Sequence, residues 1–261
     1  MIDPTRHRQL EELNMVELCT RIFRNSRNEL YLNMRYLDLS LSSLGFEADP
    51  GCRGVGTDGF VIYYHPDYVC DLYKRGRVHV NRAYLHMVLH CLFCHMDTRG
   101  KREPELWNLA CDIAVESILD DMYVKCIRVA PTPFRRDWYG RLRGKLTVLN
   151  AEGIYRILKE EHLEPRRLER LEAEFLVDDH ELWYEDQTRS QAIPRQGRWK
   201  DNREKMQTEM EARSTETSQN EEDSGLLEQV QVENRERYDY KAFLRKFAVM
   251  KEEMQVDPDS F

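Results

Sequence analysis

The stretch AYLHMVLHCLFCHM, residues 83–96, is apolar on almost every side and carries two histidines four positions apart. A helix that is apolar all round packs inside a domain, so this stretch predicts a buried central helix with Asn81 as its N-cap. Residues four apart on a helix lie on the same face, one turn from each other. His86 and His90 are therefore predicted to point the same way inside the domain.

This spacing matches the metal-binding helix of H-E-x-x-H peptidases. In that motif two histidines hold zinc, and the glutamate accepts a proton from the bound water. Met87 occupies the glutamate position here. The pattern therefore predicts a metal site that keeps its ligands and lacks its general base. The alternative is that both histidines are core residues that hydrogen-bond to backbone or carboxylate groups.

A second apolar helix is predicted over residues 105–122, and the short connection makes it an antiparallel neighbour of the histidine helix. Asp112 lies on this helix, with Glu116 one turn further along the same face. A buried carboxylate is costly without a partner, and a metal shared with the two histidines would provide one. The alternative is an ion pair with a nearby arginine, Arg99 or Arg102.

Other ligand candidates come from the same helix and from further along the chain. Cys94 lies one turn after His90 and is an alternative third ligand. His180, in the segment 177–183, is another, although a surface turn is the expectation for this residue. His95 faces about 140° away from His90, so it reaches the site only if the helix end swings back.

The remaining pattern predicts a mostly helical α+β domain. A β-branched and aromatic run at 60–64 predicts one strand of a small sheet, which we expect to pack on the histidine helix and its antiparallel neighbour. Apolar residues at helical spacing predict two helices within residues 10–41 and shorter helices after Pro133.

Composition divides the chain into three parts. Residues 1–190 are predicted to form the main domain. Residues 191–225 are predicted to be a polar, acidic and disordered linker, because 200–224 hold almost no large apolar side chains. Residues 226–261 show helical periodicity again and are predicted to lead into a following domain.

Charge and cysteine usage exclude several classes of protein. The 261 residues include 47 acidic and 39 basic ones, giving a net charge of −8, which argues against a nucleic-acid binder. No apolar run approaches the roughly 18 residues that span a bilayer, and the polar N-terminus is unlike a signal peptide. Seven cysteines without framework spacing indicate reduced thiols in a cytoplasmic protein.

Several short motifs keep the order and spacing of a known family. They are Thr57-Asp58-Gly59, His65-Pro66, the histidine helix and the run from Glu105 to Asp112. With these, the chain resembles the bacterial putative metallopeptidase domain that precedes a von Willebrand factor A-like domain, a zincin-like family with a degenerate H-E-x-x-H here. The A-like domain is absent, so the resemblance implies the N-terminal part of a longer protein.

The resemblance implies a metal site formed by His86, His90 and Asp112, with Zn²⁺ as the expected ion. It also implies a protein partner, an AAA-type ATPase. The sequence departs from the family at Met87 and at Glu116, where relatives often have asparagine. If hydrolysis is retained, Glu116 is the expected displaced base, because it lies one turn from Asp112.

Three functions remain open at this point. The first is a metal-binding pseudoenzyme that serves as an interaction module. The second is an active zinc-dependent hydrolase with a rearranged base, and the third is a metal-free scaffold. Met87 favours the first over the second, because an apolar side chain cannot deprotonate water.

Overall fold

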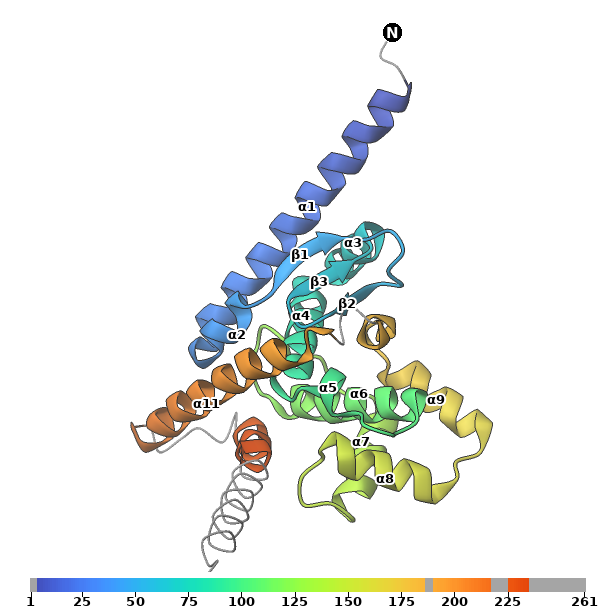
Figure 1. Cartoon of the computed structure of the whole chain (residues 1–261), viewed down its shortest axis with the longest axis vertical. Helices are drawn as coiled ribbons and strands as arrows, with labels where there is room; N and C mark the ends of the chain where they lie inside the picture. The colour runs from blue at the N-terminus through green and yellow to red at the C-terminus, as the bar shows by residue number, and fades with distance from the viewer. Residues whose placement is uncertain (1–3, 186–189, 217–224, 235–261) are drawn as a thin grey trace, which may run out of the picture.

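The computed structural model describes residues 4–185, 190–216 and 225–234. Within these ranges the protein is mostly helical with one small three-stranded sheet, which confirms the predicted α+β class (Figure 1). None of the described helices is both long and apolar enough to cross a bilayer.

Two helices were predicted within residues 10–41. The structure has one long helix, α1 (Pro4–Asn33), which covers the first predicted helix and the beginning of the second. No glycine or proline interrupts this helix, so nothing in its sequence forces a break. Its C-terminal half buries Phe23 and Leu30, whereas Leu10 and Leu13 are exposed on the N-terminal half, which projects from the body of the molecule (Figure 1). A 3₁₀ turn, η1 (Arg35–Leu37), and the short helix α2 (Asp38–Ser42) follow.

The sheet contains β1 (Gly45–Ala48), β2 (Val55–Thr57) and β3 (Val61–Tyr64). The central strand is β3, parallel to β1 and antiparallel to β2. The strand predicted at 60–64 is thus confirmed as β3.

The histidine helix is α4 (Arg77–Leu92), which follows α3 (Pro66–Arg75) after a turn at Gly76. Every residue of α4 from Val80 to Leu92 is buried, as the apolar pattern predicted. The predicted N-cap was wrong, since the helix starts one turn earlier. Asn81 lies buried inside it and donates from Nδ2 to the Cys126 carbonyl oxygen at 2.9 Å.

Helix α6 (Pro104–Asp121) packs on α4 after a short helix, α5 (His95–Thr98). The sheet contacts α4 through β2, whereas α6 packs mainly against two later helices. These two helices are α8 (Ala151–Glu161) and α9 (Pro165–Phe175), which follow α7 (Pro133–Arg143) and precede the 3₁₀ turn η2 (Glu181–Tyr184).

The predicted disordered linker at 191–225 was wrong for most of its length, because Ala192–Glu216 forms helix α11. This helix packs against α4 and α2 (Figure 1). Four buried residues recur on one face at helical spacing: Trp199, Arg203, Met206 and Met210. Overall polarity concealed this narrow buried face. Residues 225–234 are helical, consistent with the periodicity predicted after Leu226, and the rest of the predicted lead-in lies outside the described residues.

Candidate metal centre

Helix α4 presents His86 and His90 on one face, as their spacing predicted. Both side chains are completely buried. Their Nε2 atoms lie 2.8 Å apart. Two imidazoles one turn apart therefore point toward a common centre inside the protein.

Helix α6 brings Asp112 to the same centre. Its Oδ1 lies 3.2 Å from His90 Nε2 and 3.6 Å from His86 Nε2. Its Oδ2 accepts a hydrogen bond from the Val177 amide at 3.0 Å. The carboxylate thus faces the histidines and a loop amide.

The arginines considered as alternative partners of Asp112 bond elsewhere. The Arg99 Nη1 donates to the Arg102 carbonyl oxygen, and the Arg102 Nη1 donates to the Thr98 carbonyl oxygen. The structure therefore favours the shared-cation interpretation of Asp112 over the ion-pair alternative.

The loop between α9 and η2 supplies two further donors. Asp178 Oδ1 lies 3.3 Å from His86 Nε2 and 3.7 Å from His90 Nε2. His180 Nε2 lies 3.0 Å from both Asp178 Oδ1 and Asp112 Oδ1. The expectation that His180 lies on a surface turn was wrong, since it is 5% exposed. Sequence reasoning did not identify Asp178 as a donor. The signal that could have found it is the run Asp178-Asp179-His180 beside apolar residues.

The edge of the sheet holds this loop in place. The Asp179 amide donates to the Val55 carbonyl oxygen of β2 at 2.7 Å, and Gly56 forms a β-bridge with Asp179. A Cβ at position 56 would lie 2.6 Å from the Asp179 carbonyl oxygen, so only glycine fits without a shift. Close backbone approach at Gly56 thus positions two donor side chains.

Four buried polar atoms at this centre make no hydrogen bond of regular geometry among the described residues: Asp112 Oδ1, both Asp178 carboxylate oxygens and His180 Nε2. His180 Nε2 nevertheless lies within ion-pair distance of two of the others, Asp112 Oδ1 and Asp178 Oδ1. Buried polar groups left in this state are rare and costly. A cation between them would satisfy all four.

The spacing of the donors also fits a metal ion. One ligand atom from each of His86, His90, Asp112 and Asp178 lies within 4.8 Å of the others. Metal bonds of about 2.0–2.2 Å in a tetrahedron place ligand atoms about 3.3–3.6 Å apart. The histidine Nε2 atoms lie 3.2–3.7 Å from the carboxylate oxygens, close to these values, whereas the two Nε2 atoms, 2.8 Å apart, would have to separate. His180 offers a fifth donor, so the residues present fit a bound ion.

The histidines and carboxylates of the cluster shift one another's pKa values. Burial opposes the charged form of His86, but the carboxylates of Asp112, Asp178 and Glu116 overcome it and raise the pKa of His86 well above its ordinary value. The same competition, dominated by Asp178 and Asp112 over burial, raises the pKa of His180 to about 10. Despite their burial, Asp112 and Asp178 have pKa values far below the usual range, with His180 the main cause.

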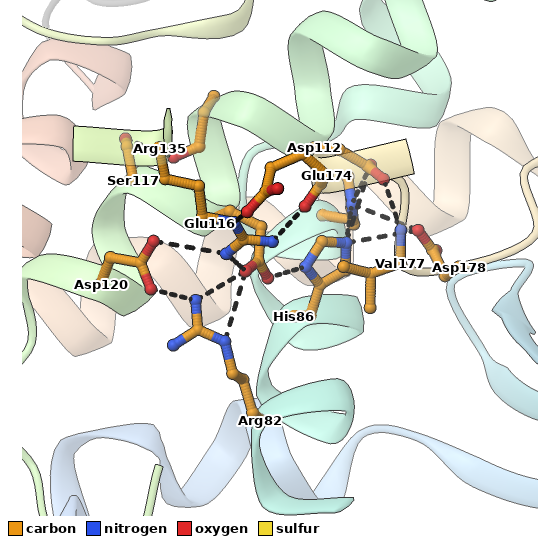
Figure 2. Close-up of polar contacts among 12 residues, drawn as sticks. Arg82, His86, Asp112, Glu116, Ser117, Asp120, Arg135, Glu174, Val177 and Asp178 are labelled. Carbon is orange, nitrogen blue, oxygen red and sulfur yellow. Dashed lines mark hydrogen bonds and ion pairs between the residues drawn. The ribbon is translucent and has the colours of Figure 1, made fainter. Parts of the chain in front are cut away.

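Glu116 lies behind His86 rather than at the centre (Figure 2). Its Oε1 is 2.8 Å from His86 Nδ1, and its Oε2 accepts from Arg82 and Arg135. A carboxylate on the outer ring nitrogen of a ligating histidine fixes its tautomer and leaves Nε2 free for a metal. The role of Glu116 as a displaced base stays a prediction, and these contacts favour a positioning role instead.

His95 reaches the site because the end of α4 does swing back. Cys94 adopts a left-handed conformation, with φ of 54°, directly before α5. This bend places His95 Nδ1 2.9 Å from His90 Nδ1, so His95 supports His90 from behind. The Cys94 thiol is not among the donors that meet at the two histidines in the described residues.

Met87 occupies the place of the expected general base. Its side chain is fully buried among the apolar core residues. It presents no group that could accept a proton.

Comparison with known proteins gives one family. The model of a family described as "putative metallopeptidase domain" matches residues 24–253, which is most of the chain. No curated protein and no solved structure matches.

Proposed function

The chain belongs to the putative metallopeptidase domain family, and we propose that it is a metal-binding pseudoenzyme of that family. In this proposal one Zn²⁺ is held by His86, His90, Asp112, Asp178 and His180. The ion stabilises the domain, and the domain acts by binding another protein rather than by cleaving peptides.

The observation that carries the proposal is the enclosure of the donors. His86, His90 and Asp112 are inaccessible to solvent, and the Asp178 side chain is equally buried. Structural zinc sites are closed by protein ligands, whereas catalytic sites keep an open position for water or substrate. Four or five protein donors leave no open position.

The surroundings also lack a free base. A bound zinc ion would polarise a ligand and lower the pKa of a bound water, but hydrolysis needs a group that takes the proton. Met87 cannot do so. Both oxygens of Glu116 accept hydrogen bonds already, and Arg82 and His86 hold the pKa of its buried carboxyl well below the usual range. A carboxylate held in this way is a weak base.

Imidazole and carboxylate donors suit zinc, and they also suit iron or manganese. We propose zinc because two histidines at helical spacing with a carboxylate from a second helix form a common zinc set. The proposed partner, an AAA-type ATPase, is supported by the family resemblance.

Metal analysis of the untagged full chain tests the proposal. We expect about one zinc per chain by plasma mass spectrometry, lost in a His86→Ala/His90→Ala double variant. His79→Ala is the matched control, because His79 belongs to the same helix and lies outside the donor cluster. It should keep its metal.

Three results would overturn the proposal or part of it. Absence of metal from the folded wild-type chain would make the protein a metal-free scaffold. Peptide hydrolysis that disappears in Glu116→Gln while zinc is retained would make it an active enzyme with a displaced base. Iron in place of zinc would overturn the choice of ion.

A further inference from the structure

A second group of metal-binding side chains lies between α1 and α3. Cys19 Sγ is 3.9 Å from Cys70 Sγ, and the Cys70 thiol donates to Met15 Sδ at 3.3 Å. Met15 and Cys19 are one turn apart on α1, so their sulfur atoms lie on the same face. We call Met15, Cys19 and Cys70 the sulfur cluster.

The sulfur cluster is anchored in the core and open toward the surface. Cys19 is completely buried, and its thiol contacts the Pro66 carbonyl oxygen at 3.5 Å. Cys70 and Met15 are half-buried. Burial and the neighbouring Cys70 raise the pKa of Cys19 to about 12, so the Cys19 thiol is protonated and uncharged unless a metal displaces its proton.

We propose that Met15, Cys19 and Cys70 bind a soft monovalent cation of the Cu(I) class. Two cysteine sulfurs and one thioether form the ligand set that selects Cu(I), unlike the nitrogen and oxygen donors of the metal centre. Metal–sulfur bonds of about 2.3 Å in a trigonal arrangement separate the sulfur atoms by about 4 Å. The Cys19–Cys70 separation already has this value, and Met15 Sδ, which is 3.3 Å from Cys70 Sγ, would have to move away from Cys70.

The chemistry of binding is balanced without an oxidant. Each thiol that binds releases its proton to solvent, and Met15 binds through a sulfur lone pair, so no electron is transferred. The bound ion would tie the long helix α1 to α3. This inference is independent of the proposed zinc centre, because the two sites share no residue and differ in donor type.

The test is a Cu(I) titration of the reduced full chain without oxygen, against a chromophoric Cu(I) chelator. We expect the wild-type chain to retain one Cu(I) per molecule. Cys70→Ser should weaken binding by more than about 100-fold, because even partners that do not touch the metal contribute about 10- to 100-fold to affinity. Met15→Leu removes the neutral thioether, and we expect a loss of about tenfold.

Cys52→Ser is the matched control, because Cys52 is a buried thiol that also donates to a backbone carbonyl, that of Tyr63. It should leave Cu(I) binding unchanged. Failure of the wild-type chain to retain Cu(I) against the chelator would overturn the proposal, as would equal retention by Cys70→Ser. Circular dichroism checks that the variants are folded. If Cys70→Ser does not fold, Cu(I) binding by Met15→Leu tests the proposal.

Discussion

Two buried clusters of charged groups lie one turn apart on α4 and α6, and only in one of them does the protein itself donate to every carboxylate oxygen. In the first, both oxygens of Glu116 and both of Asp120 accept hydrogen bonds, with Arg82 and Arg135 as shared donors (Figure 2). In the second, Asp112 keeps one oxygen without a hydrogen bond.

The second cluster also contains Asp178, neither of whose oxygens is hydrogen-bonded among the described residues. The carboxylates of both clusters are at most 3% exposed, so the difference does not lie in how deeply the acids are buried. Guanidinium groups neutralise the Glu116 cluster permanently. The Asp112 cluster has only histidines, whose charge can be displaced, and this is the property that a metal site needs.

The largest expected effect is on the Glu116 cluster. Glu116→Ala would remove one of the two carboxylates that Arg82 and Arg135 share and leave them Asp120, and removal of one partner from a buried ion pair costs about 3–5 kcal/mol. Urea unfolding should show this loss with and without a metal chelator. Glu174→Ala, which removes a more exposed partner of Arg135, should cost less than about 1 kcal/mol. Equal losses in the two variants would contradict the comparison.

Chelation should affect the other cluster. An ion present at about 1,000 times its dissociation constant stabilises the folded state by about 4 kcal/mol. A strong chelator should therefore lower the melting temperature of the wild-type chain in calorimetry. It should leave that of the His86→Ala/His90→Ala variant unchanged. An unshifted wild-type melt would mean that the unsatisfied atoms do not hold an ion.

Asp178→Asn tests whether the Asp178 carboxylate binds the metal or only holds its loop in place. The amide lacks one anionic oxygen donor, so zinc affinity should fall by at least about 10- to 100-fold. Asp179→Asn is the matched control, because the Asp179 carboxylate accepts from the backbone amides of Arg53 and Glu181 instead. Competition with a fluorescent zinc chelator measures both variants, and a similar loss in each would assign the effect to loop packing.

The last prediction concerns pH. Without metal, the pKa of His180 is about 10 and that of His86 is well above its ordinary value, so both are protonated at neutral pH. A metal must displace these protons, and its affinity should rise with pH by about tenfold per unit for each proton displaced. Competition with the fluorescent zinc chelator, measured from about pH 6.5 to about pH 8.5 on either side of neutrality, tests this. Affinity independent of pH would show that His86 and His180 are neutral before binding.

The sequence alone determined the centre of the fold. An all-apolar run with two histidines predicted the buried helix α4, and a carboxylate on the next apolar helix predicted that Asp112 would lie beside them. Helical spacing predicts which residues of one helix lie together, because residues one turn apart share a face. Strand β3 was also predicted from a local pattern, a run of β-branched and aromatic residues.

Only the tertiary structure brought Asp178 and His180 to the centre. Their loop is more than 60 residues from Asp112 along the chain, and a single β-bridge at Gly56 and a hydrogen bond to Asp112 place it. Neither contact leaves a periodic signal in the sequence. Helix α11 was concealed similarly, since four buried side chains on one face do not change an overall polar composition. A helix can be predicted from the periodicity of neighbouring residues. The full set of donors at the metal centre depends on contacts between residues that are far apart in the sequence.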